Sequence, residues 1–286
     1  LKTIPGLEYI IEENEVLRLG ALTRLSDITQ SDVVKTKYPL LAEAVATVGT
    51  PQIRNMATIA GSICQGLSCW YYRAYKNAYW CLYKRGKDCP AKERDNRWMF
   101  SIFGDAEGCY GTCQSDTSIA LYALSARVKT TKRTIPIEEF FTTSAPGNVL
   151  ESDEIITEIE VPSISADAKM KYLKLSVRKS IDPPLVSVAC LLNVKDAKIV
   201  LGGVYLTPYR ARYAEDVIRG KEIDERLAEE AGEAAVIGAV PLSMNAWKVQ
   251  VTRVLVKRAL LDLSSLSIPS FLIKFVDVIN SKEVVP

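Results

Sequence analysis

Histidine is missing from all 286 residues of this sequence. Its absence excludes a Ser-His-Asp or Cys-His catalytic set, acid–base catalysis by imidazole and every metal site with a histidine ligand. Any metal or redox chemistry must therefore use other side chains. The seven cysteines are the strongest metal ligands that remain.

Long apolar runs are also missing, and the first residues lack the pattern of a signal peptide. The formal net charge of only +2 gives no argument for nucleic-acid binding. A chain of this length that is 48% hydrophobic fits one large domain or two ordinary ones. It begins with Leu1 rather than Met, so we expect part of the N-terminal region to lie upstream.

The cysteines are unevenly spread. Six fall between positions 64 and 113, and only Cys190 stands apart. Disulfides would require an oxidising compartment, and a structural zinc site usually has short Cys-x2-Cys pairs. Wide spacing among aromatic residues fits an iron–sulfur cluster on four thiolates better, although spacing alone leaves zinc open.

Residues 65–113 form an insert with neither helical period nor strand alternation. Its aromatic residues outnumber its aliphatic ones, so we expect the rings to form a small core. Between Cys69 and Trp98 there are eight basic and three acidic residues. Such an excess of cations would offset the negative charge of a thiolate-bound cluster, although a solvated or docking face gives the same pattern.

Regular patterns surround the insert. Alternation predicts strands at 15–22, 128–131, 133–137, 154–161, 171–177, 184–194 and 198–206. Helical patterns cover 38–48, 116–126, 210–219, 224–239 and 245–263. Cys190 lies in the apolar stretch VSVACLLNV, which predicts a buried, inert thiol.

The stretch GTPQIRNMATIAGSIC, residues 49–64, resembles an FAD-contacting motif of the flavin subunits of molybdenum hydroxylases, the xanthine dehydrogenase and carbon monoxide dehydrogenase group. The segments CWYYRAY, WCLYKRGKDC and FGDAEGCYGTCQSDT are similar to the insert of a narrower branch. That branch includes the β subunit of 4-hydroxybenzoyl-CoA reductase and the medium subunit of periplasmic aldehyde oxidases, and it carries an extra 4Fe–4S cluster. The motifs ESDEIITEIEVP and LKLSVRKSIDPPLVSVA extend the resemblance over nearly the whole chain.

The resemblance implies which residues bind cofactors. The implied cluster ligands are Cys69, Cys81, Cys89 and Cys109, with Cys64 and Cys113 as spares. The implied FAD contacts are Ala57, Thr58, Ile59, Ala60, Gly61, Ser62, Asp116, Ile156 and Lys174. Small residues in 57–62 suit close backbone approach to a pyrophosphate. For Asp116 a helix N-cap is the competing interpretation, and for Lys174 an exposed strand lysine.

Two departures from the family pattern stand out. Ala60-Gly61 replaces the usual pair of glycines. The family's other glycine-rich FAD loop would lie upstream of residue 1, so we expect residues 1–286 alone to bind FAD weakly.

The resemblance implies an α+β fold. An FAD-binding domain of vanillyl-alcohol-oxidase type at 1–163, N-terminally incomplete and interrupted by the insert, would precede a carbon monoxide dehydrogenase flavoprotein-like domain of antiparallel sheet and helices at 168–286. The implied function is electron transfer through FAD and a 4Fe–4S cluster, with substrate chemistry on a partner and no catalytic residue in this chain.

The implied partners are a large molybdopterin subunit and a small 2Fe–2S subunit, with a ferredoxin or another electron carrier as a further candidate. We expect a cytoplasmic location, or a periplasmic one if a partner carries the export signal. A zinc-stabilised module without redox activity and a stand-alone FAD oxidase are the alternatives.

Overall fold

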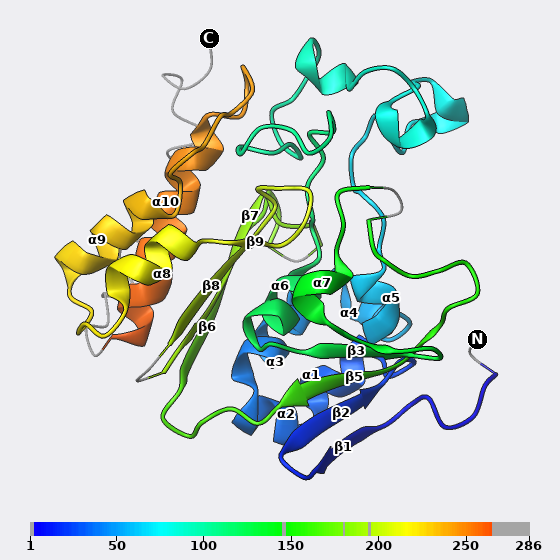
Figure 1. Cartoon of the computed structure of the whole chain (residues 1–286), viewed down its shortest axis with the longest axis vertical. Helices are drawn as coiled ribbons and strands as arrows, with labels where there is room; N and C mark the ends of the chain where they lie inside the picture. The colour runs from blue at the N-terminus through cyan, green and yellow to red at the C-terminus, as the bar shows by residue number, and fades with distance from the viewer. Residues whose placement is uncertain (1–2, 145–146, 180, 194–195, 265–286) are drawn as a thin grey trace.

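The computed structural model describes residues 3–144, 147–179, 181–193 and 196–264. This part of the chain consists of two antiparallel sheets, the helices that pack on them and a separate lobe (Figure 1). The first sheet has the strand order β1-β2-β5-β3-β4. Its strands are β1 (Ile10–Glu13), β2 (Val16–Gly20), β3 (Arg127–Thr130), β4 (Thr134–Pro136) and β5 (Ile156–Pro162).

Alternating side chains set the buried face of this sheet. In β2, Leu17 and Leu19 are fully buried, and they stand opposite Val161 and Ile159 of β5. The same residues belong to a core shared with short helices that cover the sheet. These helices are α1 (Leu25–Gln30), α2 (Asp32–Lys37), α3 (Pro39–Ala46), α4 (Pro51–Arg54), α5 (Ile59–Ile63), α6 (Asp116–Ala123) and α7 (Ile137–Phe140).

The second sheet has the order β6-β7-β8-β9 and lies between two groups of helices. One face packs against α3 and α6. Helices α8 and α10 pack against the other face, and α9 packs on α8 and α10 (Figure 1). β7 is therefore buried almost throughout. The elements are β6 (Lys169–Leu175), β7 (Val186–Leu192), β8 (Ala197–Gly202), β9 (Tyr209–Arg210), α8 (Arg212–Ile218), α9 (Glu225–Ala234) and α10 (Trp247–Leu263).

Helix α6 connects the two halves. It begins where the insert ends, its cap is the Ser115 side chain, and almost all of its residues are buried. It contacts α3 and α5 on one side and β7 and β8 on the other. A helix buried on all sides needs no polar face, which explains why its sequence lacks a clear amphipathic stripe.

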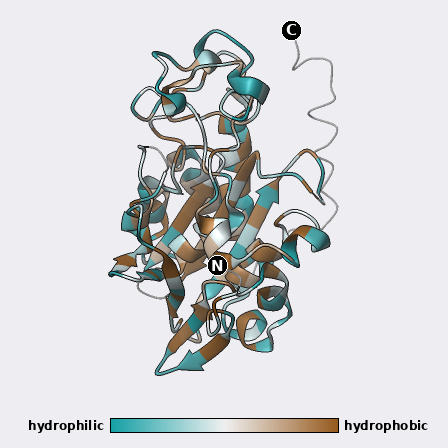
Figure 2. Ribbon diagram, turned by 90° about the vertical axis from the view of Figure 1, so that its right-hand side faces the viewer, coloured by the Kyte–Doolittle hydropathy of each residue, from teal (hydrophilic) through white to brown (hydrophobic). Residues whose placement is uncertain are grey.

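The insert forms the lobe above the two sheets in Figures 1 and 2. It contains only the 3-10 turns η1 (Tyr75–Asn77), η2 (Leu82–Lys84) and η3 (Pro90–Lys92). Aromatic rings provide its core: Phe100 is fully buried, with ring centroids 5.6 Å from Trp70 and 5.9 Å from Tyr71. The predicted aromatic core of the insert is confirmed.

The sequence patterns located most elements but missed some ends. The predicted strand at 15–22 is β2 alone, and its partner β1 was not predicted. The predicted helix at 224–239 ends at Ala234. Positions 265–286 of the predicted C-terminal domain lie outside the described residues. In the described part of the chain, no helix is both long and apolar enough to cross a membrane.

Candidate functional site: a four-cysteine cavity beside a flavin-type domain

Four cysteines of the insert line one cavity: Cys69, Cys81, Cys89 and Cys109. Cys81 and Cys89 directly precede the turns η2 and η3. The turn after Cys81 is closed by the Gly86 amide, which donates to the Cys81 carbonyl at 2.9 Å. A Cβ atom on Gly86 would lie 2.0 Å from the Trp80 carbonyl oxygen, so only glycine fits there.

The cavity wall suits thiolate ligands. The Gly111 amide lies 3.4 Å from Cys109 Sγ, and the amides of Tyr71 and Tyr72 donate to Cys69. Such N–H···S bonds stabilise sulfur-bound iron clusters and tune their potentials. The rest of the wall is mostly apolar and consists of Leu67, Tyr71, Tyr72, Leu82, Tyr83, Pro90 and Gly111.

Two of the four thiols, Cys69 and Cys109, have raised pKa values in the metal-free chain. Burial raises the pKa of Cys69 to about 11 and that of Cys109 to about 12, and the other thiols of the cavity add to both shifts. A bound metal centre reverses this preference, because its positive charge stabilises the thiolates. The donor set and the enclosing wall therefore fit a metal-containing group.

Among the described residues, no three Cys, Asp or Glu side chains gather closely enough to hold one metal ion. The four thiols of the insert line the same small cavity. Of the two spares, Cys113 lines a neighbouring cavity and Cys64 packs against the main core. Cys190 is fully buried in β7, as predicted.

The C-terminal domain anchors the insert. The Lys248 ammonium of α10 is fully buried and donates to the carbonyls of Trp98, Phe100 and Gly203 at 3.1, 2.9 and 2.5 Å. The Asn245 amide donates to the carbonyls of Phe100 and Ser101. Burial lowers the pKa of Lys248 to about 7. Sequence reasoning missed both anchors, since no local pattern distinguishes Lys248 from other helical lysines.

The predicted flavin stretch, residues 57–62, is a loop that enters α5. Thr58 caps the helix by accepting from the Gly61 amide at 3.2 Å. Gly61 is exposed, and a Cβ atom there would meet only Thr58 Oγ1, at 3.1 Å. A phosphate can therefore approach the open edge at Gly61.

Most amides of this stretch already have acceptors. The Ile59 amide donates to the Thr23 carbonyl and the Ala60 amide to the Ala21 carbonyl, at 2.9 and 3.3 Å. The Ser62 amide donates to Thr58. The Gly61 amide is likewise bound, to Thr58 Oγ1, and the contact of this stretch with a pyrophosphate stays a prediction.

Asp116 and Lys174 are brought together as an ion pair. Lys174 Nζ lies 2.7 Å from Asp116 Oδ2 and 3.0 Å from the Thr47 carbonyl, and Tyr172 donates to Asp116 Oδ1 at 2.5 Å. Burial raises the pKa of Asp116, and the ammonium opposes that rise. Asp116 is not the N-cap, because Ser115 has that role. Lys174 is not an exposed strand lysine, since its side chain is only 7% exposed.

Tyr172 and Thr47 were not predicted as site residues. Tyr172 precedes Lys174 by two positions in an alternating strand, so its placement on the same face could have been found from the sequence.

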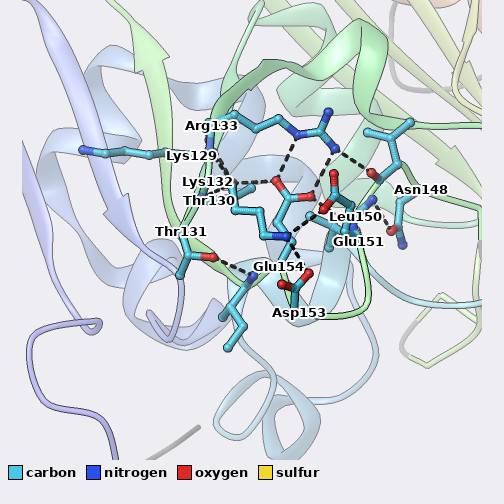
Figure 3. Close-up of polar contacts among 12 residues, drawn as sticks. Lys129, Thr130, Thr131, Lys132, Arg133, Asn148, Leu150, Glu151, Asp153 and Glu154 are labelled. Carbon is cyan, nitrogen blue, oxygen red and sulfur yellow. Dashed lines mark hydrogen bonds and ion pairs between the residues drawn. The ribbon is translucent and has the colours of Figure 1, made fainter.

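Ile156 is buried at the start of β5, in the same core as Ile59 of α5. The turn before it is fixed by Glu154, which accepts from Thr130 and Arg133 (Figure 3). Ile156 therefore lies in the core of the domain that contains the predicted flavin stretch, residues 57–62. Its predicted contact with the ring stays a prediction, as do the other flavin contacts.

Comparison with known families agrees with this architecture. The family described as "FAD binding domain in molybdopterin dehydrogenase" matches residues 1–164, and "CO dehydrogenase flavoprotein C-terminal domain" matches residues 171–263. This chain belongs to the family of FAD-binding subunits of molybdopterin dehydrogenases. The predicted α+β fold, with these two types of domain, is confirmed, as is the class of oxidoreductase FAD subunit.

Individual relatives agree with this assignment. The aldehyde oxidoreductase FAD-binding subunit PaoB of Escherichia coli is 30% identical over 224 residues, which are 73% of this chain and 69% of that protein. The glyceraldehyde dehydrogenase medium chain of Sulfolobus acidocaldarius is 29% identical and covers 78% of this chain, which spans 66% of its length. The carbon monoxide dehydrogenase of Oligotropha carboxidovorans shares the fold, with a TM-score of 0.71 at 20% identity, covering 93% of this chain and 82% of that one.

Proposed function

We propose that this chain is the FAD and iron–sulfur subunit of a molybdenum hydroxylase, with a 4Fe–4S cluster on Cys69, Cys81, Cys89 and Cys109. The proposal includes two partner subunits, a large one that binds molybdopterin and a small one with 2Fe–2S clusters. Substrate chemistry then takes place on the large subunit, and this chain passes electrons between its partners and an external carrier. A ferredoxin is one candidate for that carrier.

The single observation that supports the cluster most is the convergence of four cysteines from separate turns on one cavity. The remaining three cysteines of the chain lie elsewhere, so the set is selective. The family assignment supports FAD independently. When bound, these two groups supply the one-electron and two-electron chemistry of the subunit.

The protein's own residues hold and shield these groups. The aromatic side chains of Tyr71, Tyr72 and Tyr83 line the cysteine cavity. Several cations of the insert lie over aromatic rings, with Lys84 Nζ 5.6 Å from the Tyr72 centroid and the Arg94 guanidinium 5.4 Å from that of Tyr79. Positive charge beside an anionic cluster stabilises its reduced form.

Iron and sulfide analysis of the anaerobically purified complex tests the cluster. We expect four iron and four sulfide per chain beyond those of the small subunit, as the formula 4Fe–4S requires. Cys81→Ser should lower this content, while Cys190→Ser, a matched change of a buried thiol, should leave it unchanged. Zinc in place of iron would favour a structural module and contradict the proposal.

The partners are tested by purification of the native protein. We expect it to elute with a molybdenum-containing subunit and to have little activity alone. A fully active single chain would favour a stand-alone FAD oxidase.

A further inference from the structure

A second cavity lies below the insert, next to the cysteine cavity. Leu67 and Tyr83 line both spaces, so one layer of side chains separates them. The return segment of the insert and the first turn of α6 form the other side through Gln114 and Ser118. The space open to the centres of water molecules is about 30 Å³.

The side chains of Gln114 and Ser118 carry polar atoms that need partners. Gln114 is 6% exposed and Ser118 is fully buried. Neither polar atom of the Gln114 amide nor Ser118 Oγ has a hydrogen-bond partner among the described residues. A buried amide can make four hydrogen bonds and a hydroxyl three, and leaving them unmade costs considerable free energy.

The backbone prevents Gln114 from turning out to solvent. The Cys113 amide donates to the Tyr205 carbonyl, and the Cys113 carbonyl accepts from the Gly203 amide, both at 2.7 Å. On the other side, Ser115 caps α6 and donates to the Ser62 carbonyl at 2.9 Å. With both neighbours fixed, the Gln114 side chain stays in the cavity.

We propose that this cavity is an internal hydration site in which one or two waters are bound by Gln114 and Ser118. No residue of the lining carries a charge at neutral pH, so the ligand is neutral. It must both donate and accept, since an amide N–H, an amide oxygen and a hydroxyl face it. Each water needs roughly 10–15 Å³ of such space, so the volume has room for two.

These waters would connect Gln114, at the end of the insert, to Ser118 of α6 by hydrogen bonds. Helix α6 also carries Asp116. The site therefore fixes the position of the cysteine cavity relative to the flavin-type domain. This inference does not depend on the identity of the metal group, because Gln114 and Ser118 are not ligands of the cysteine cavity.

A crystal structure of the native complex, at a resolution that orders internal waters, tests the site directly. We expect density for one or two waters within hydrogen-bond distance of the Gln114 amide and Ser118 Oγ. A dry cavity, or a Gln114 amide bonded directly to protein atoms, would overturn the inference.

Hydrogen exchange in solution provides the second test. Gln114→Met and Ser118→Ala should each speed exchange of the Cys113 and Gly203 amides by roughly tenfold, the effect of losing one buried hydrogen-bonded contact. Gln30→Met, a change of an exposed glutamine in α1, is the matched control and should have no effect. Iron and flavin contents are measured on the same samples, so failure of the cofactor assignment is recognised separately. Ser118→Ala is the less disruptive of the two substitutions. If the exchange rates of the Cys113 and Gly203 amides do not change in Ser118→Ala, the site is contradicted even if Gln114→Met fails to fold.

Discussion

Lys174 of β6 reaches across the boundary between the two sheets to Asp116 at the start of α6, with 2.7 Å between Nζ and Oδ2. Both side chains are almost fully buried, at 7% and 3% exposed. The pair therefore joins the C-terminal sheet to the helix that follows the insert. A buried charge that loses its partner is costly, so this contact is sensitive to single changes.

The first prediction concerns this pair. Asp116→Asn should lower the free energy of unfolding by about 3–5 kcal/mol, because it leaves the Lys174 ammonium buried without a counter-charge. The double variant with Lys174→Met should recover part of this loss, as urea unfolding of the four chains would measure. Strictly additive losses would mean that the two groups do not interact.

The second prediction concerns the flavin. Gly61→Val should lower the flavin content of the purified complex at least tenfold, a loss of about 1.4 kcal/mol or more in binding. The reason is that the branched side chain would occupy the open edge where a phosphate approaches. The fold should tolerate the change, since only Thr58 Oγ1 lies near the new Cβ atom.

The control for this change is Gln30→Val, which places the same side chain on an exposed helical position of α1. Gly61→Ala should have an intermediate effect. Normal flavin content in Gly61→Val would show that the phosphates lie elsewhere.

The third prediction concerns Lys248, whose pKa burial lowers from 10.5 to about 7. Between these two values the unfolded chain binds more protons than the folded chain, so stability rises with pH across this window. Relative to Lys248→Met, the wild type should gain up to a few kcal/mol from pH 7 to pH 10.5. Denaturant unfolding at a series of pH values measures this difference, and a constant difference would refute the lowered pKa.

The fourth prediction concerns the stability of the fold at acidic pH. Glu154 accepts from Arg133 and Thr130, and these hydrogen bonds lower its pKa from 4.5 to about 2 (Figure 3). A depressed pKa stabilises the fold above pH 4.5, and the contribution disappears as pH falls through about 2. Glu154→Gln should therefore melt below the wild type at neutral pH and approach it in acid. A melting difference independent of pH would contradict this.

The sequence could predict the parts of the site that depend on local residues, but not the parts that depend on contacts between residues far apart in the chain. The cavity is lined by the four cysteines that the family resemblance implied as ligands. By contrast, the pairing of Asp116 with Lys174 joins residues far apart in the chain and follows from no local pattern. The Ile59 and Ala60 amides of the predicted flavin stretch likewise depend on distant residues, since they donate to the carbonyls of Thr23 and Ala21.

The sequence by itself determined the places of most strands and helices, the position of the insert and the character of its aromatic core, because periodicity and composition are local properties of the chain. Only the tertiary structure decided that α10 holds the insert through Lys248, that α6 lies buried between helices α3 and α5 and the second sheet, and that Gln114 faces a cavity. These features depend on which surfaces meet after folding. Burial then fixes the charges and hydrogen bonds of side chains that are unremarkable in the sequence.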